Sequence, residues 1–408
     1  MKLSLPRRLW YENDSLEITL PDDWQVELCP MAGAGRQTLS RDEIEAALAQ
    51  PVGSPPLREL AQGKRSAVIV FDDMTRPTRC AQIAPFLLRE MAAAGVPEEA
   101  VTFVCALGTH GALSFHELRK KLGQDIVERF RVFNHNTYEN CDEVGTTSLG
   151  TKVRINREVL AADLKLAISC VTAHPYAGFS GGGKILMPGV AHIDSIADHH
   201  TRVMALKPDG VGLGKFAGNL VRQDIDEAAD MVGLDFSVNV LVNQRGEAAA
   251  VVAGDLRRSH AKAVELAQGW YATSPRPRNV DVVISNAFVK ANEMPIAVAL
   301  ARGALKPQGG TVVVIADSPE GQVVHYLLGR FGRAHGGRMY PVRQLPDNFR
   351  LIIMAPSLDR TFGDWFANPE VITFSKTWDQ TMELLAGEHG PGTRAAVLPN
   401  ATMQYFKS

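Results

Sequence analysis

Short apolar runs rich in β-branched residues alternate with segments of helical periodicity over most of this chain. Such runs are typical of parallel strands, because the helices that connect parallel strands cover both faces of the sheet. The runs are 67–71, 101–107, 164–170, 236–242, 280–284, 311–315 and 351–354, and the helical segments are 81–94, 114–122, 193–204, 255–270 and 294–302. The pattern predicts an α/β fold with mostly parallel, Rossmann-like sheets.

The chain is long enough for more than one domain. Its 408 residues suit two domains, at roughly 150 residues each. Segment 271–279 has two prolines and no apolar run, which is typical of a linker. We therefore expect an N-terminal domain over residues 1–274 and a C-terminal α/β domain over 275–408, with a cleft between them.

Charge and cysteine content narrow the class of protein. The formal net charge of −2 argues against a nucleic-acid partner, and no apolar run approaches the length of a membrane span. The five cysteines are dispersed and include no C-x-x-C pair: Cys29, Cys80, Cys105, Cys141 and Cys170. Free thiols of this kind predict a reducing compartment and a cytoplasmic protein.

The loop after the first buried run, residues 72–78, holds two aspartates, two threonines and an arginine. Ligand-binding residues of parallel sheets lie in the loops that follow the carboxyl ends of strands. Threonine and arginine can donate hydrogen bonds to a phosphate there. The same residue types also suit a helix cap and a turn. The residues alone leave these two interpretations level.

His110 follows the second run in the segment Gly108-Thr-His110. A histidine can accept or give a proton near neutral pH, so this position at a strand end makes it a candidate general base. A lone histidine is more often a hydrogen-bonded structural residue, and that alternative stays open.

The densest motif is the loop 174–184, which runs from a histidine to a triple glycine and Lys184. Its glycine spacing does not fit a P-loop, and Ile185 stands where the hydroxyl residue would be, so an NTPase is not indicated. A lysine leaving such a loop can contact a phosphate or become a covalent anchor. Four small residues before it can bring backbone N–H groups close to a phosphate: Ser180, Gly181, Gly182 and Gly183.

Two adjacent histidines, His199 and His200, lie in the predicted helix 193–204. Neighbouring residues on a helix point about 100° apart, so the pair does not form a two-histidine metal site. One of them can be a single ligand to a metal that is held mainly by another group. The alternative is a histidine near a helix end that contacts solvent.

Together these stretches resemble the lactate racemase family, the nickel–pincer-nucleotide-dependent 2-hydroxyacid racemases and epimerases. The matching elements come in the same order and spacing over most of residues 60–205: Asp73-Met-Thr-Arg76, Gly108-Thr-His110, His174-Pro-Tyr-Ala-Gly178, the Ser180–Lys184 loop, and His200 sixteen residues after the lysine. Any one of these motifs alone is weak, whereas the ordered set is specific.

The resemblance implies a cofactor and a role for each motif. The cofactor is the nickel complex of pyridinium-3,5-bisthiocarboxylic acid mononucleotide, covalently attached to Lys184, with His200 as the protein ligand to nickel. Catalysis falls to His110 and His174, which exchange protons with the substrate hydroxyl while the C2 hydride moves to and from the cofactor. The residues implied to bind the cofactor are Asp73, Thr75, Arg76, Ser180, Gly181, Gly182 and Gly183. The C-terminal domain closes over the substrate, and cofactor maturation proteins are transient partners.

The second domain departs from the lactate-specific pattern. Lactate-type members carry a Tyr-Gln pair and then a lysine, where this chain has Pro295, Ile296 and Ala299. Candidate substrate contacts are instead Lys290, Asn292 and Glu293, together with Arg76. We therefore expect a 2-hydroxy acid other than lactate. Asn292 and Glu293 also suit a polar helix start, and this alternative is level with the first.

Two other classes of function stay in view. A non-catalytic binder or carrier of the nucleotide would keep the phosphate loops but would not need both His110 and His174. An unrelated NAD- or zinc-dependent α/β enzyme would need a G-x-G-x-x-G motif or a multi-ligand zinc spacing, and the sequence has neither.

Overall fold

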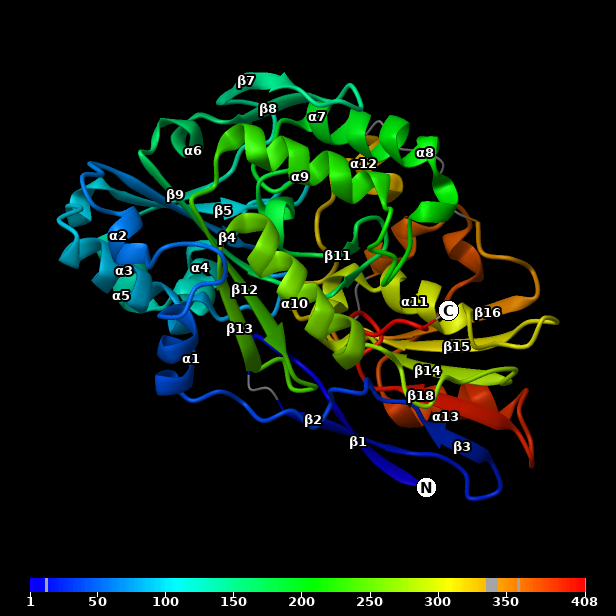
Figure 1. Cartoon of the computed structure of the whole chain (residues 1–408). Coiled ribbons are helices and arrows are strands. Elements are labelled where there is room, and N and C mark those ends of the chain that lie inside the picture. Colours follow the sequence, from blue (N-terminus) through cyan, green and yellow to red (C-terminus); the bar gives the residue numbers. More distant parts are fainter. Residues whose placement is uncertain (12–13, 335–343, 358–359, 408) are drawn as a thin grey trace. The chain divides into compact units, whose positions relative to one another are not determined.

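The computed structural model describes residues 1–11, 14–334, 344–357 and 360–407, and they form an α/β fold (Figure 1). The chain divides into two compact units. One unit is Arg36–Gln268, and the other combines Met1–Gly35 with Gly269–Ser408. The first 35 residues, expected in the N-terminal domain, thus group with the C-terminal part of the chain. The predicted fold class is confirmed.

The unit Arg36–Gln268 is built on a six-stranded sheet in the order β13-β12-β9-β4-β5-β6. All neighbouring strands are parallel except β13, which is antiparallel to β12. The strands are β4 (Ala67–Asp72), β5 (Val101–Ala106), β6 (Arg131–Asn134), β9 (Leu164–Cys170), β12 (Phe236–Val242) and β13 (Ala248–Gly254), and a separate hairpin pairs β7 (Cys141–Thr146) with β8 (Lys152–Asn156). Every residue of β4 and β12 is buried, as expected of strands covered on both faces.

The helices of this unit follow the predicted alternation with the strands. They are α1 (Arg41–Leu48), α2 (Leu57–Leu60), α3 (Ala84–Ala93), α4 (Phe115–Leu122), α5 (Gln124–Arg129), α6 (Arg157–Ala161), α7 (Ile193–Asp198), α8 (Met204–Leu206), α9 (Leu220–Val232) and α10 (Leu256–Trp270). Helix α4 begins at a capping box, in which Ser114 and Glu117 each satisfy the other's backbone N–H group. Between α7 and α8 the helix widens into a π turn over His199–Val203.

The other unit holds a fully parallel six-stranded sheet in the order β17-β16-β15-β14-β18-β3. Its elements are the hairpin β1 (Lys2–Pro6) and β2 (Ser15–Thr19), the strands β3 (Gln25–Leu28), β14 (Val282–Asn286), β15 (Gly310–Ile315), β16 (Phe349–Met354), β17 (Thr373–Ser375) and β18 (Arg394–Leu398), and the helices α11 (Pro295–Arg302), α12 (Gly329–Ala334) and α13 (Trp378–Ala386). Strand β3 is an edge strand beside β18, which explains why the N-terminal residues group with this unit.

Candidate functional site

Three loops that carry the predicted site residues follow neighbouring strands of one sheet. Strands β9, β4 and β5 are adjacent and parallel, so the loops after them leave at the same edge. Two hydrogen bonds link these loops directly. The Cys170 N–H donates to Asp72 Oδ2 at 2.8 Å, and the Gly108 N–H donates to the Gly189 carbonyl at 2.8 Å. The sheet thus gathers motifs that lie about 100 residues apart in the chain.

A buried carboxylate is paired with the candidate base His110. Asp73 Oδ2 lies 2.5 Å from His110 Nδ1, and its other oxygen accepts hydrogen bonds from the Thr75 hydroxyl at 2.5 Å and the Thr75 N–H at 3.0 Å. Burial alone would raise the pKa of Asp73, but the charge and hydrogen bond of His110, with help from Arg76 and Thr75, lower it to about 2. Asp73 is therefore an ionised acceptor that holds a proton on His110 Nδ1.

Arg76 contacts Thr75 beside this pair, and its backbone carbonyl accepts a hydrogen bond from Lys121. The guanidinium Nη1 donates to the Thr75 hydroxyl at 2.8 Å and the Thr75 carbonyl at 3.0 Å, and the side chain is half-buried. The fully buried ammonium of Lys121 donates to the Arg76 carbonyl at 2.8 Å and pairs with Asp72 Oδ1 at 2.8 Å. Asp72 also accepts from the Thr78 hydroxyl at 2.6 Å. These contacts fix the backbone of the loop 72–78 around Arg76.

The contacts of His174 place its ring proton on Nε2, whereas the proton of His110 is on Nδ1. It ends β10 (Ala173–His174), which pairs with β11 (Gly178–Phe179) in a tight hairpin. Its Nδ1 accepts hydrogen bonds from the backbone N–H groups of Tyr176 and Ala177, both at 3.2 Å. A nitrogen that accepts two such bonds carries no proton, so the neutral ring carries its proton on Nε2.

Tyr176 lies between His174 and the predicted nickel ligand. Its ring meets the His174 ring edge-on with centroids 6.0 Å apart, and the His200 ring edge-on at 5.5 Å. The Tyr176 backbone is fixed by Asn219, whose amide donates to the Tyr176 carbonyl at 2.8 Å. This contact chain places His174 and His200 in one neighbourhood. Tyr176 was not among the predicted site residues, although it lies inside the His174–Gly178 motif.

The triple glycine packs tightly against the protein. A Cβ at Gly181 would lie 2.7 Å from a Val171 methyl, one at Gly182 2.5 Å from the His260 ring, and one at Gly183 2.9 Å from Ala229 Cβ. The Gly182 N–H already donates to the Asn239 amide oxygen at 3.0 Å. These contacts account for the glycines through close packing of the loop, so a phosphate-binding role for them stays a prediction.

The Ser180 hydroxyl is also used inside the fold. It donates to the Cys170 carbonyl at 2.7 Å and accepts from the Thr172 N–H at 2.9 Å, and the residue is buried. Lys184 differs, because its side chain is half-buried at the end of the glycine run. Of the two residues, Lys184 is the one that can reach a ligand.

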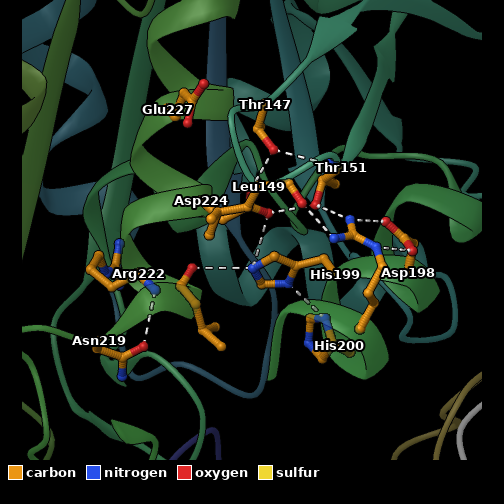
Figure 2. Close-up of polar contacts among 12 residues, drawn as sticks. Thr147, Leu149, Thr151, Asp198, His199, His200, Asn219, Arg222, Asp224 and Glu227 are labelled. Atoms are coloured by element: carbon orange, nitrogen blue, oxygen red, sulfur yellow. Dashed lines mark hydrogen bonds and ion pairs between the residues drawn. The ribbon is translucent and has the colours of Figure 1, made fainter. Parts of the chain in front are cut away.

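The two adjacent histidines contact each other within the π turn (Figure 2). His199 Nδ1 lies 3.1 Å from His200 Nδ1, and His199 Nε2 lies 3.1 Å from the Val221 carbonyl oxygen. Burial chiefly lowers the pKa of His199, Asp224 and Val221 oppose that shift, and the positive charges of Lys184 and Arg222 lower it further. The turn Gly182–Ile185, which carries Lys184, and the π turn, which carries His200, both pack against α9.

The predicted substrate residues Lys290, Asn292 and Glu293 lie in the other unit, in a 3-10 segment between β14 and α11. Lys290 is fully buried, while Asn292 and Glu293 are half-buried. Their contact with substrate stays a prediction.

Two residues of the site neighbourhood were not anticipated. Lys121 supports the Arg76 loop, and Asp224 is buried beside His199 with Thr147 and Thr151 donating to its oxygens. Lys121 follows the buried Leu118 by three residues on α4, and this helical spacing could have marked it as inward-facing. No comparable signal marks Asp224.

Within the described ranges, no three or more His, Cys, Asp or Glu side chains are grouped so that they could hold a metal ion. Among the same residues, no helix combines the length and apolarity needed to cross a bilayer.

Comparisons with known proteins agree with this arrangement. Residues 11–211 match the family described as the lactate racemase N-terminal domain. A lactate racemase from Thermoanaerobacterium thermosaccharolyticum is 29% identical over 318 residues, covering 76% of this chain and 74% of that protein. A lactate racemase from Lactiplantibacillus plantarum is 25% identical over 412 residues, covering 96% of this chain and 97% of that protein.

Solved structures show the same fold. The lactate racemase apoprotein from T. thermosaccharolyticum aligns over 100% of both chains with a TM-score of 0.76 and 22% identity. A protein from Thermotoga maritima aligns over 90% of this chain and 98% of its own, with a TM-score of 0.66 and 19% identity.

Fold and site define a two-unit α/β protein with His110 and His174 in segments that follow two strands at the carboxyl edge of a parallel sheet. The sequence matches identify that class further: this chain belongs to the lactate racemase family.

Proposed function

We propose that this chain is a racemase or epimerase that inverts C2 of a 2-hydroxy acid, using a nickel–pincer nucleotide. Its family supports the isomerase class. The observation that carries the proposal is the pair His110 and His174, which the fold holds with their protons on opposite ring nitrogens. Inversion of an alcohol centre needs both a proton acceptor and a proton donor at the substrate oxygen.

His110 is prepared to accept the hydroxyl proton. The carboxylate of Asp73 holds a proton on His110 Nδ1, so Nε2 is the nitrogen with the lone pair. When His110 takes a proton on Nε2, the adjacent negative charge of Asp73 stabilises the imidazolium. This is the general logic of a carboxylate that orients a catalytic histidine.

His174 is prepared to donate. With Nδ1 accepting two backbone N–H groups, its Nε2–H can form a hydrogen bond to the substrate oxygen. The two histidines therefore start from different states: His110 can accept the hydroxyl proton, whereas neutral His174 donates a hydrogen bond to the substrate oxygen and gives up a proton only when its ring has become an imidazolium. The half-buried Arg76 is the cation that can bind the substrate carboxylate or the cofactor phosphate.

The residues present fit the implied cofactor. Lys184 is half-buried in the turn Gly182–Ile185, and this turn and the π turn of His200 both pack against α9, so both residues can belong to one site. Imidazole is a ligand type that suits nickel. When bound, the nickel–pincer nucleotide supplies a hydride acceptor for the substrate C2. In the proposal Lys184 anchors it, His200 ligates the nickel, and Asp73, Thr75 and Arg76 lie toward the nucleotide.

We propose a 2-hydroxy acid other than lactate as substrate. Pro295, Ile296 and Ala299 stand in the region where lactate-type members carry their Tyr-Gln pair and lysine. In their place, Lys290, Asn292 and Glu293 would contact a larger, polyhydroxy acid. The cofactor implies separate maturation proteins as transient partners. A cytoplasmic location, expected from five cysteines that are all free in the structure, stays a prediction.

A substrate panel tests this function. The chain is produced together with cofactor-making proteins and incubated with C2-deuterated acids, from lactate to sugar acids, and chirality and deuterium loss are followed. We expect inversion of at least one acid, no inversion by His110→Asn, and weak inversion of lactate. A nickel-loaded chain that inverts no acid would contradict the proposal and favour a non-catalytic carrier of the nucleotide.

A further inference from the structure

We propose that His199 is a positioning residue that fixes the His200 ring with its proton on Nδ1 and its lone pair on Nε2. This inference rests on the proposed role of His200 as nickel ligand. A histidine can ligate a metal only through an unprotonated nitrogen, so the tautomer of His200 decides which of its two nitrogens is available. The contacts of His199 fix the tautomer of His200 without a bound metal or cofactor.

The first contact fixes the proton of the His199 ring on Nε2. His199 Nε2 lies 3.1 Å from the Val221 carbonyl oxygen and 3.8 Å from Asp224 Oδ2. A carbonyl oxygen can only accept, so the proton of this hydrogen bond belongs to His199 Nε2. In a neutral ring, the other nitrogen of His199 then carries a lone pair.

The second contact determines which nitrogen of His200 is protonated. The two Nδ1 atoms lie 3.1 Å apart, which is a hydrogen-bond distance that needs one proton between them (Figure 2). Because His199 Nδ1 carries the lone pair, the proton belongs to His200 Nδ1. The remaining nitrogen of His200, Nε2, is therefore the one that can bind a metal.

The helix geometry makes this contact possible. Adjacent residues on a regular α-helix point about 100° apart, which separates their side chains. Here the helix widens into the π turn His199–Val203, and the two ring centroids come within 5.0 Å. Such local widening of a helix is frequent at functional sites.

The surroundings hold His199 rigidly in this position. Its side chain is fully buried, and Asp224 beside it is fully buried too. Asp224 is fixed by the hydroxyls of Thr147 and Thr151, with the Thr151 oxygen 2.7 Å from Asp224 Oδ2 (Figure 2). On the other side, the Tyr176 ring meets the edge of His200. The half-buried His200 ring therefore contacts two neighbouring rings, those of His199 and Tyr176.

Nitrogen-15 NMR of the full-length chain made without maturation proteins tests this proposal without any cofactor. With 15N-labelled histidine, long-range proton–nitrogen spectra at pH 8 report which nitrogen of each ring is protonated, and His200→Gln assigns the signal. We expect His200 to show a protonated Nδ1 and an unprotonated Nε2. A His200 ring protonated on Nε2 would overturn the proposal, whatever becomes of the proposed function.

Variants separate positioning from mere filling of space. In His199→Gln the amide can donate to the Val221 carbonyl and accept from His200 Nδ1, so the His200 tautomer should persist. In His199→Leu it should be lost. The matched control is His135→Leu, because His135 is also buried, with Nε2 at 2.9 Å from the Ala191 carbonyl and Nδ1 accepting from Asn156 at 3.1 Å. An unchanged His200 tautomer in His199→Leu would overturn the proposal.

Nickel retention provides the second readout. Loss of a residue that orients a metal ligand typically costs about 10–100-fold in metal affinity. We expect nickel to leave loaded His199→Leu for a chelator about 10–100 times faster than loaded wild type, and His199→Gln to stay close to wild type. Equal release from wild type and His199→Leu would count against positioning. A wild-type chain that takes up no nickel would refute the proposed function but not the tautomer result.

Discussion

Replacing Asp73 by asparagine should destabilise the protein by an amount that the structure allows us to work out. The carboxylate is buried, and its contacts with His110, Arg76 and Thr75 overcome the effect of burial and lower its pKa from 3.8 to about 2. At about 1.4 kcal/mol per pKa unit, the ionised form gains about 2.5 kcal/mol from the fold. Asp73→Asn keeps the shape of the side chain and removes this charge.

The pH window follows from the sign of the shift. Because the folded-state pKa lies below the unfolded value, the stabilisation is complete above pH 3.8 and is lost as the pH falls towards 2. At pH 5 histidine ordinarily carries a charge, so the full contact with His110 is present. The difference in unfolding free energy between wild type and Asp73→Asn should then stay at about 2–2.5 kcal/mol from pH 5 to pH 4.

Urea unfolding followed by circular dichroism measures this difference. The control is Asp142→Asn, because Asp142 pairs with Arg157 at 2.8 Å in an exposed position. Exposed ion pairs contribute at most about 1 kcal/mol, so this variant should lose less. Equal losses in the two variants, or an Asp73 effect that grows as the pH is lowered, would refute the reasoning about the buried pair.

Three further predictions concern the support of the site. Gly182→Ala should destabilise more than Gly233→Ala in thermal unfolding, because both glycines have positive φ but only a Cβ at Gly182 meets a neighbour, His260, at 2.5 Å; equal effects would show that packing is not the reason for the glycine. Lys121→Met should cost about 3–5 kcal/mol in urea unfolding, since it leaves Asp72 buried without its ammonium partner, and a loss under 1 kcal/mol would contradict the ion pair. The pKa of His260 is lowered to about 3, chiefly by burial and also by the charge of Arg222, while the hydrogen bond to the Ser180 carbonyl opposes this shift. This histidine therefore destabilises the fold progressively as the pH falls below 6.5. The stability of wild type relative to His260→Gln should therefore decrease by about 1.4 kcal/mol per pH unit below 6.5, and a pH-independent difference would exclude this assignment.

The sheet strands were predictable from sequence because they are buried on both faces. Each of the seven predicted runs forms a strand whose ends differ by two residues at most from the expectation. Strand β3 was not placed with the C-terminal sheet, because its Gln-Val-Glu-Leu sequence is that of a mostly exposed edge strand. Helix α1 was also missed, although Ser40 and Glu43 form a capping box that the sequence displays.

The sequence provided candidate site residues but not the contacts that those residues make. The order of motifs singled out His110, His174, Lys184 and His200, and the sheet topology explains why their loops meet. The partner of His110 depends on the tertiary fold, because Asp73 lies 37 residues away in the chain. The partners of His174 and His200 are local, namely the backbone N–H groups of Tyr176 and Ala177 and the neighbouring His199, and they depend on turn geometry that the sequence does not display. The glycine run shows the reverse case, since a motif that suggests a phosphate loop is also required by close packing against Val171, His260 and Ala229.

Intact-mass analysis of the chain produced with cofactor-making proteins tests the central claim most directly. The proposal predicts an adduct of nucleotide mass, mapped to Lys184 by peptide analysis, with one nickel ion per chain. Lys184→Arg should carry neither the adduct nor the nickel while keeping the far-UV circular dichroism of the fold. A wild-type chain that emerges unmodified and free of nickel from the same cells would contradict the assignment of this site to a nickel–pincer nucleotide.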